Sequence, residues 1–198
     1  MDTNQEYELK LMLLESEYNN LADLEGEEPF LQVNHYYDTV GLDLYKARRM
    51  LRIRNKNGGF ELTVKATGLF AAREGIASMT ENNIILDVVE AAEILGGRFR
   101  INEYLTAFPD IAGLELLPVG TLATLRKKVV MDTGLPMAEV DRNSYLGIVD
   151  YELEWEIDES MYGHALGILK GKGVGIEGRE TGRSKYGRFI AGLPGKGN

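Results

Sequence analysis

The chain has 198 residues, of which 44% are hydrophobic and 27% are charged, so it is long enough to bury a core of its own. It contains no cysteine and two histidines, which excludes disulfides and both thiolate and histidine-rich metal sites. A metal would need carboxylate ligands, which suit Mg²⁺, Mn²⁺ or Ca²⁺. The net charge of −9 argues against general nucleic-acid binding. No apolar run is long enough to span a bilayer, and the acidic N-terminus is unlike a signal peptide. We therefore expect a cytoplasmic protein with neither a nucleic-acid nor a membrane partner.

The first predicted element is a strand at residues 5–12, whose side chains alternate between two faces. Glu6, Glu8 and Lys10 share one face, and Tyr7 and two leucines share the other. A later strand, at residues 151–156, repeats this arrangement with three carboxylates on one face: Glu152, Glu154 and Glu156. Both strands have a strongly apolar reverse face. Their acids are therefore expected to face either a common polar interior or solvent.

Periodicity predicts further elements after the first strand. In chain order these are a helix at 15–25, a strand at 32–38, a short helix or turn at 42–49, and two strands at 50–54 and 60–66. Asn57-Gly58 lies between the last two strands, and this dipeptide favours a tight hairpin turn. Arg52 and Arg54 share a face of the first arm, while Lys65 shares a face of the second arm with Glu61 and Thr63.

The second half of the chain is predicted to contain both helices and strands. In order, we expect a strand at 70–77, a helix at 82–95 after a capping box at 78–81, a helical segment at 102–108, strands at 120–131 and 137–142, and helices at 161–170 and 183–193. Gly96 is expected to end one helix and Pro109 to stop the next. Eight short strands in two similar blocks favour a closed or nearly closed β-sheet over a βαβ fold.

Acids and bases fall on matching faces of several predicted strands. The acids are Glu6, Glu8, Asp141, Glu152 and Glu154, and the bases are Lys10, Arg52, Arg54, Lys65, Arg126, Lys128, Lys185 and Arg188. If they share one interior it must be wet, because unpaired buried charges cost several kcal/mol each. Such a lining suits a polyanion with a divalent cation, since Arg and Lys hold phosphate oxygens and carboxylates hold Mg²⁺ or Mn²⁺. The alternative for each pair is a solvated strand face, and the number of strands with the pattern favours the interior.

The order of these motifs resembles the CYTH family, also called triphosphate tunnel metalloenzymes. Glu6-x-Glu8-x-Lys10 is similar to the ExExK signature of that family. Further matches follow in the family's order: His35-Tyr36-Tyr37-Asp38-Thr39, Leu51-Arg52-Ile53-Arg54, Leu62-Thr63-Val64-Lys65, Arg126 with Lys128, Glu152-x-Glu154, and Ser184-Lys185-x-x-Arg188-Phe189. The resemblance covers nearly the whole chain and is greatest to short bacterial members grouped with inorganic triphosphatases and thiamine triphosphatases.

The resemblance implies an α+β fold in which an eight-stranded antiparallel closed β-barrel forms a tunnel with helices packed outside. It implies one tunnel domain at residues 1–193 with a flexible tail at 194–198. The metal, Mg²⁺ or Mn²⁺, would be held by four glutamates: Glu6, Glu8, Glu152 and Glu154. Phosphate would be bound by Lys10, Arg52, Arg54, Lys65, Arg126, Lys128, Lys185 and Arg188. Glu8 and Lys10 would be catalytic, with Lys10 orienting the scissile group or the attacking water. Arg73 and Glu74 depart from the family pattern, so both tunnel and surface stay open for them.

These features together predict a divalent-metal-dependent triphosphatase. Its substrate would be inorganic triphosphate or a small organic triphosphate such as thiamine triphosphate, with the metal polarising the phosphoryl group or activating a water. Two alternatives stay open. One is an adenylate cyclase of class IV type, which the same family contains and which converts ATP to cyclic AMP and pyrophosphate. The other is a non-catalytic polyphosphate-binding module. The oligomeric state, a homodimer included, is open as well.

Overall fold

The structure is a computed structural model that describes residues 6–67, 79–97, 101–105, 108–179 and 183–195. At residues 6, 7, 67, 79 and 80 it describes the backbone alone. The predicted strand at 70–77, with Arg73 and Glu74, therefore lies outside the described residues. Among the helices that are described, none combines the length and the apolar character that a membrane crossing requires.

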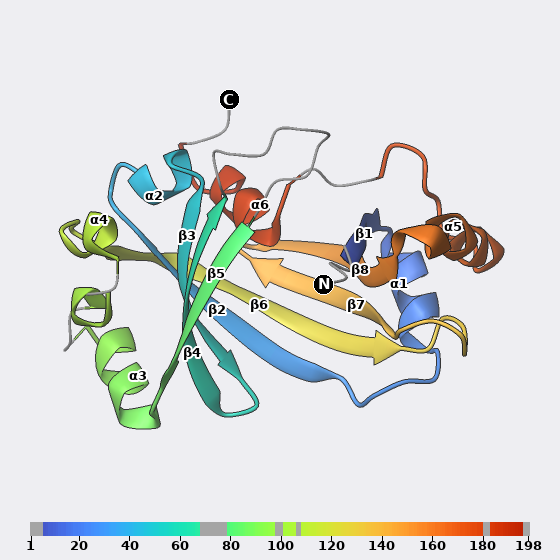
Figure 1. Cartoon of the computed structure of the whole chain (residues 1–198), viewed down its shortest axis with the longest axis horizontal. Helices are drawn as coiled ribbons and strands as arrows, with labels where there is room; N and C mark the ends of the chain where they lie inside the picture. Colours follow the sequence, from blue (N-terminus) through green and yellow to red (C-terminus); the bar gives the residue numbers. More distant parts are fainter. Residues whose placement is uncertain (1–5, 68–78, 98–100, 106–107, 180–182, 196–198) are drawn as a thin grey trace, which may run out of the picture. The chain divides into compact units, whose positions relative to one another are not determined.

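Eight antiparallel strands make up the sheet (Figure 1). They are β1 (Glu6–Leu13), β2 (Phe30–Asp38), β3 (Arg49–Lys56), β4 (Gly59–Thr67), β5 (Met79–Leu86), β6 (Leu117–Val129), β7 (Ala138–Tyr145) and β8 (Ile148–Asp158). Their hydrogen-bonded order is β1-β8-β7-β6-β2-β3-β4-β5. An antiparallel sheet of eight strands with helices confirms the α+β prediction. The order has two ends, β1 and β5, so hydrogen bonds do not close the sheet within the described residues, and the predicted closed barrel is not confirmed.

The helices are short, and the chain divides into two compact units. Unit 1 comprises residues 1–31 and 122–198, and unit 2 comprises residues 32–121. The α-helices are α1 (Glu15–Ala22), α2 (Asp43–Lys46), α3 (Val88–Leu95), α4 (Pro109–Ala112), α5 (Tyr162–Gly171) and α6 (Lys185–Ala191). Two 3₁₀ helices, η1 (Ile101–Tyr104) and η2 (Glu159–Met161), complete the set in the described part of the chain.

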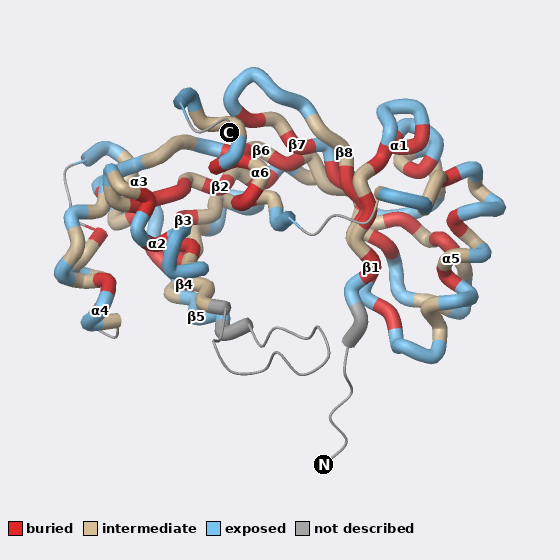
Figure 2. The backbone as a smooth tube through the Cα atoms, turned by 90° about the horizontal axis from the view of Figure 1, so that it is seen from above, coloured by how far each residue is buried: buried red, intermediate tan, exposed pale blue. Residues whose placement is uncertain are grey.

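In unit 1 the strands separate an apolar face from a charged face. Leu11 of β1 lies opposite Leu153 of β8 in the register, and both are fully buried. Trp155 is also fully buried, and its indole N–H donates a hydrogen bond to the Pro136 carbonyl oxygen at 2.8 Å. Residues of α1 and α5 pack against these strand residues, and buried and exposed positions alternate along both helices (Figure 2). Because strand side chains alternate, the residues between these apolar positions point to the other face.

Lys127 is the polar residue that breaks the alternation of β6. Its ammonium group donates hydrogen bonds to the carbonyl oxygens of Ala22 at 2.6 Å and Leu24 at 2.9 Å, at the end of α1. The last carbonyl groups of a helix lack partners within it and attract a cation. Lys127 therefore fixes α1 against the sheet from the apolar side.

Unit 2 is built on the hairpin of β3 and β4. Asn57 and Gly58 have φ angles of 51° and 78°, which a type I′ turn requires and which Asn-Gly adopts readily. The turn sets a register in which Ile53 lies opposite Leu62, and both are fully buried together with residues of α3. The predicted hairpin is thus confirmed, with its polar residues on the face opposite this core.

The helix predicted at 82–95 is wrong in its first part. The structure has the strand β5 there, in which Ile84 lies opposite Leu62, and the helix α3 begins only at Val88. Asp87 caps it: its carboxylate accepts the Glu90 N–H at 2.8 Å, and its own N–H donates to Glu90 Oε2 at 2.9 Å. The capping box therefore lies after β5 and not at 78–81. A short apolar run fits the helical period of 3.6 residues as well as the strand period of two, and here its pairing with β4 makes it a strand. Gly96 ends the helix as predicted.

The helical segment predicted at 102–108 is confirmed in part: the 3₁₀ helix η1 covers Ile101–Tyr104, and residues 106–107 lie outside the described residues. Pro109 does not stop a helix but begins α4, a position where its missing N–H and fixed φ are favourable.

Glu17 ties α1 to the segment that follows α5. Its carboxylate accepts the N–H groups of Leu14 at 2.7 Å and Gly175 at 2.9 Å and forms an ion pair with Arg179. Burial raises the pKa of Glu17, but these donors and Arg179 lower it more, so the pKa lies below its ordinary value. The ionised form of Glu17 is therefore the one that stabilises the fold.

We expect Glu17→Gln to lower the free energy of unfolding by about 2 kcal/mol near neutral pH, because it weakens hydrogen bonds to a charged group. The folded-state pKa of Glu17 is below the unfolded value, so its stabilisation is complete above the unfolded value and is lost as the pH falls through the folded value. Urea unfolding at several pH values measures this. Glu15→Gln, an exposed position on α1, serves as the control. A difference that does not shrink in acid would contradict the assignment.

Candidate functional site

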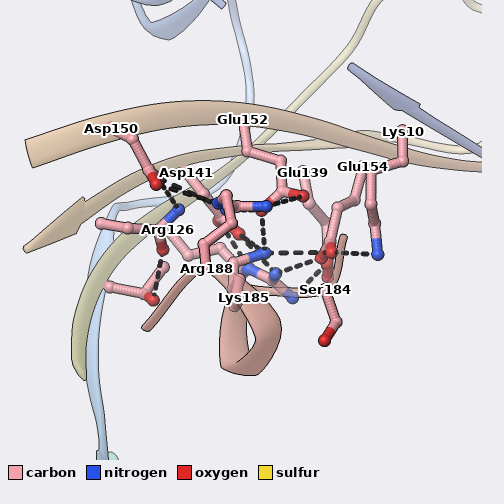
Figure 3. Close-up of polar contacts among 12 residues, drawn as sticks. Lys10, Arg126, Glu139, Asp141, Asp150, Glu152, Glu154, Ser184, Lys185 and Arg188 are labelled. Atoms are coloured by element: carbon pink, nitrogen blue, oxygen red, sulfur yellow. Dashed lines mark hydrogen bonds and ion pairs between the residues drawn. The ribbon is translucent and has the colours of Figure 1, made fainter. Parts of the chain in front are cut away.

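The charged face of unit 1 gathers side chains from four strands and α6 (Figure 3). The register places Lys10 of β1 opposite Glu154 of β8, and Glu154 opposite Glu139 of β7. Arg126 of β6 lies opposite Asp141 of β7. Because each strand alternates, every second residue adds to this face. Its members are Glu8, Lys10, Arg126, Lys128, Glu139, Asp141, Asp150, Glu152, Glu154, Lys185 and Arg188, and we call this set the charged face.

Glu154 is the carboxylate that most of the cations share. Its Oε1 lies 2.8 Å from Lys10 Nζ and 3.0 Å from Lys185 Nζ, and its Oε2 lies 2.6 Å from Arg126 Nη2. Burial raises the pKa of Glu154, but Lys185, Lys10 and Arg126 lower it more, so the pKa lies far below its ordinary value. Glu154 is therefore ionised at any physiological pH.

Lys185, the first residue of α6, is surrounded by carboxylates. Its ammonium group lies 2.9 Å from Asp141 Oδ2, 2.7 Å from Glu152 Oε2 and 3.0 Å from Glu154 Oε1. Burial lowers the pKa of Lys185, but these three acids raise it more, well above the ordinary value. Ser184 caps α6 by accepting the Gly187 N–H at 3.1 Å, which fixes where the helix begins.

Arg126 joins the acids of β7 and β8. Its Nε donates to Asp141 Oδ1 at 2.7 Å and its Nη2 to Asp141 Oδ2 at 2.6 Å, while a further ion pair links it to Glu139. Burial raises the pKa of Glu139 above its ordinary value, and this outweighs the opposite effect of Arg126. Lys128 is the most exposed cation of the group, and its Nζ lies 3.8 Å from Glu139 Oε1. Its charge is therefore the least neutralised of the charged face in unit 1.

Lys10 contacts one acid of its own strand, β1, and one acid of β8. Its Nζ lies 3.2 Å from Glu8 Oε1 and 2.8 Å from Glu154 Oε1, and the Glu8 side chain is 45% exposed.

Within the described residues, no three acids or histidines are grouped closely enough to hold a metal on their own. Mg²⁺ commonly binds through one or two carboxylates and completes its shell with water and phosphate oxygens. The donor chemistry of Glu8 and Glu154 therefore fits Mg²⁺ or Mn²⁺. For Glu6 the structure describes the backbone alone.

Unit 2 carries a smaller face with a basic excess. Arg52 is buried, and its Nε has no hydrogen-bond partner among the described residues. Its nearest acid is Glu81 of β5, at 3.8 Å from Nη2, and the same carboxylate lies 2.5 Å from Lys65 Nζ. Burial and then Arg54 lower the pKa of Arg52 to about 10. A buried donor without a partner is costly, so this guanidinium is suited to an anion.

Arg54 follows Arg52 by two residues on β3 and so lies on the same face of the strand. Its Nε donates a hydrogen bond to Asn34 Oδ1 at 3.1 Å, and Glu61 is its partner in the register. Glu61 also accepts a hydrogen bond from the Thr63 hydroxyl at 3.2 Å. We call Arg52, Arg54 and Lys65 the basic face of unit 2.

Three acids of these faces are missing from the predicted site residues. The sequence pattern places Glu81 in a capping box and leaves Asp150 just outside the strand predicted at 151–156, whereas both belong to strands. Glu139 lies on the strand predicted at 137–142, where only Asp141 is predicted as a site residue. The available signal is the period of two: Asp150 precedes Glu152 and Glu154 at that spacing, and Glu139 precedes Asp141.

Comparison with known proteins supports a common fold and family. The CYTH domain family model matches residues 4–169. "Putative triphosphatase YjbK" of Bacillus subtilis (strain 168) is 29% identical over 155 residues, which are 76% of this chain and 76% of that protein.

Two solved structures cover nearly the whole chain. One is "Putative adenylyl cyclase HpAC1 from Hippeastrum", described as revealing a dominant triphosphatase activity. It has a TM-score of 0.73 and 27% identity, and the match covers 96% of this chain and 98% of that one. The other is a "putative adenylate cyclase (bh2851)" from Bacillus halodurans, with a TM-score of 0.71 and 27% identity over 93% of this chain and 97% of that one.

Glu154→Gln tests the central place of this carboxylate. We expect it to lower the free energy of unfolding by about 2 kcal/mol, because three cations lose a charged partner. Glu156→Gln is the matched control: Glu156 belongs to the same strand but is exposed, so its change should stay within about 0.5 kcal/mol. Chemical unfolding of both variants gives the comparison. Equal stabilities would show that the cations do not depend on Glu154.

Proposed function

Since the chain belongs to the CYTH domain family, we propose that it hydrolyses a phosphoanhydride bond of a triphosphate with a divalent cation. The observation that supports this most is the charged face of unit 1, where the carboxylates of β7 and β8 lie among cations of β1, β6 and α6 around Glu154. Phosphoryl transfer requires both kinds of group, because the substrate and its cation carry opposite charges. The relatives described as triphosphatases support the same reaction. The substrate that we propose is inorganic triphosphate or thiamine triphosphate.

We assign the cation to the glutamates of β1 and β8. Glu8 and Glu154 are the proposed ligands whose side chains the structure describes, with Glu6 added from the family signature. Bound Mg²⁺ or Mn²⁺ would supply charge neutralisation and Lewis acidity to the phosphoryl group. Glu152 was predicted as a further ligand; both of its oxygens contact Lys185 or Arg188, which favours a role in holding α6.

The phosphate-binding groups that we propose in unit 1 are Lys10, Arg126, Lys128 and Lys185. The acids around these cations hold them in place on one face of the sheet. Lys10 contacts Glu8 and Glu154, two of the proposed metal ligands, and we assign it to orient the scissile group or the attacking water. In unit 2 the basic face of Arg52, Arg54 and Lys65 is assigned to phosphate as well. These cations would offset the charge that develops on the transferred phosphoryl group.

A second candidate is adenylate cyclase activity, because both structural relatives are named for it. In that reaction the ribose 3′-hydroxyl of ATP attacks its own α-phosphate and pyrophosphate leaves. The same charged face would bind ATP and its metal ion, since ATP is also a triphosphate and the metal ion is again divalent. The products distinguish the two reactions: cyclic AMP with pyrophosphate for the cyclase, orthophosphate for the hydrolase.

The direct test is a screen of inorganic triphosphate, thiamine triphosphate and ATP with Mg²⁺, Mn²⁺ or Ca²⁺, measuring orthophosphate, pyrophosphate and cyclic AMP. We expect metal-dependent release of orthophosphate from a triphosphate. Glu8→Gln should abolish it and leave the fold intact, because it removes ligand charge without changing volume. Glu15→Gln is the control. Tight triphosphate binding without turnover would indicate a binding module, and wild-type activity in Glu8→Gln would exclude the metal role.

Arg52→Ala tests the basic face of unit 2. A triphosphate carries more charge than a monophosphate and has more oxygens to contact Arg52, Arg54 and Lys65. We therefore expect the substitution to weaken triphosphate binding about tenfold and monophosphate binding less. Calorimetric titration of both anions, with the exposed Arg48→Ala as control, measures the difference. Equal losses for both anions would contradict a multidentate contact.

A further inference from the structure

Arg188 of α6 uses all three of its guanidinium nitrogens on protein groups. Nε lies 2.9 Å from Asp150 Oδ2, and Nη2 lies 3.4 Å from Asp150 Oδ1 and 2.8 Å from Glu152 Oε2. Nη1 donates to Glu152 Oε1 at 3.2 Å and to the Arg183 carbonyl oxygen at 3.1 Å. The guanidinium thus spans two neighbouring acids of β8 and the chain that leads into its own helix (Figure 3).

Asp150 is held in place from β7. Asn143 donates its side-chain amide to Asp150 Oδ1 at 2.9 Å, and the Tyr145 hydroxyl donates to Asp150 Oδ2 at 2.7 Å. Burial and Asp150 raise the pKa of Tyr145 to about 12, so its hydroxyl stays a donor. Asn143 in turn accepts a hydrogen bond from the Thr124 hydroxyl of β6 at 2.7 Å. A continuous chain of buried or half-buried polar groups therefore runs from β6 to α6.

We propose that Asp150 and Arg188 form a latch that holds α6 on β8 and thereby positions Lys185 in the charged face. The role of Lys185 in turnover rests on the proposed function, whereas the latch itself does not. Lys185 precedes Arg188 by three residues, so the two side chains lie on one side of the helix. Both reach the same atom: Glu152 Oε2 lies 2.7 Å from Lys185 Nζ and 2.8 Å from Arg188 Nη2.

This makes Arg188 a positioning residue and not the phosphate ligand that the family resemblance implies. For a phosphate to bind the guanidinium, the carboxylates of Asp150 and Glu152 would have to give up their cation. Glu152 is fully buried and the Asp150 side chain is 13% exposed, and a buried acid deprived of its partner is strongly destabilising. The planar fork of arginine offers five donors in fixed directions to the two carboxylates, whereas a lysine offers a single ammonium group.

The first test needs no substrate. Arg188→Lys and, independently, Asp150→Asn should speed hydrogen exchange at the amides of α6 by about tenfold or more, since the helix opens locally when its anchor weakens. Arg142→Lys is the control, because it makes the same exchange of side chains at an exposed position of β7. Unchanged exchange in α6 for both latch variants, with circular dichroism showing folded protein, would overturn the latch.

The second test is a double-mutant cycle on kcat/KM for inorganic triphosphate. Alone, Arg188→Lys is expected to lower kcat/KM about tenfold; in a Lys185→Met background it should have no further effect, because residues that act through one another are not additive. Equal losses in both backgrounds would show that Arg188 contacts substrate itself and would overturn its positioning role. Absence of turnover in the wild type with every metal would refute the proposed function instead, and the exchange experiment would still decide the latch.

Discussion

The pairing of buried charges around Glu154 is the constraint on which unit 1 depends. Three cations reach this one carboxylate, and each also contacts another acid of the charged face. Such a set is tolerated only when its members stay paired, because an isolated buried charge is far more costly than a surface one. The pairing also fixes the strands: a shift by one residue would turn Lys10 and Glu154 toward the apolar core that contains Leu11 and Leu153. Packing and chemistry therefore require the same register.

The two units differ in how completely their cations are paired with carboxylates. In unit 1 the acids outnumber the bases of the charged face, and each cation named there has at least one carboxylate nearby. In unit 2 Glu81 serves both Lys65 and Arg52, and Arg52 keeps a buried nitrogen for which the described residues supply no partner. In unit 1, carboxylates suited to a divalent cation therefore lie among cations suited to phosphate, whereas the basic face of unit 2 suits an anion alone.

Much of this could be predicted from the sequence, because strand alternation is local. A spacing of two residues is enough to assign Glu8 and Lys10, or Arg52 and Arg54, to one face of a strand. The strand β5 could not be distinguished from a helix, since its pairing with β4 involves residues distant in sequence. The closed barrel was not confirmed, because whether the first and last strands meet is a property of the whole sheet. Asp150 was missed only because its strand begins earlier than the apolar pattern indicates.

The attachment of α6 has a consequence for the newly made protein. Asp141 and Glu152 are synthesised before Lys185 and Arg188, so for a time the ribosome-bound chain holds these acids without two of the cations that later neutralise them. Strands β7 and β8 can pair during that interval, but the side chains between them repel one another. The full charge pairing of Asp141 and Glu152 therefore becomes possible only after the residues of α6 have been added.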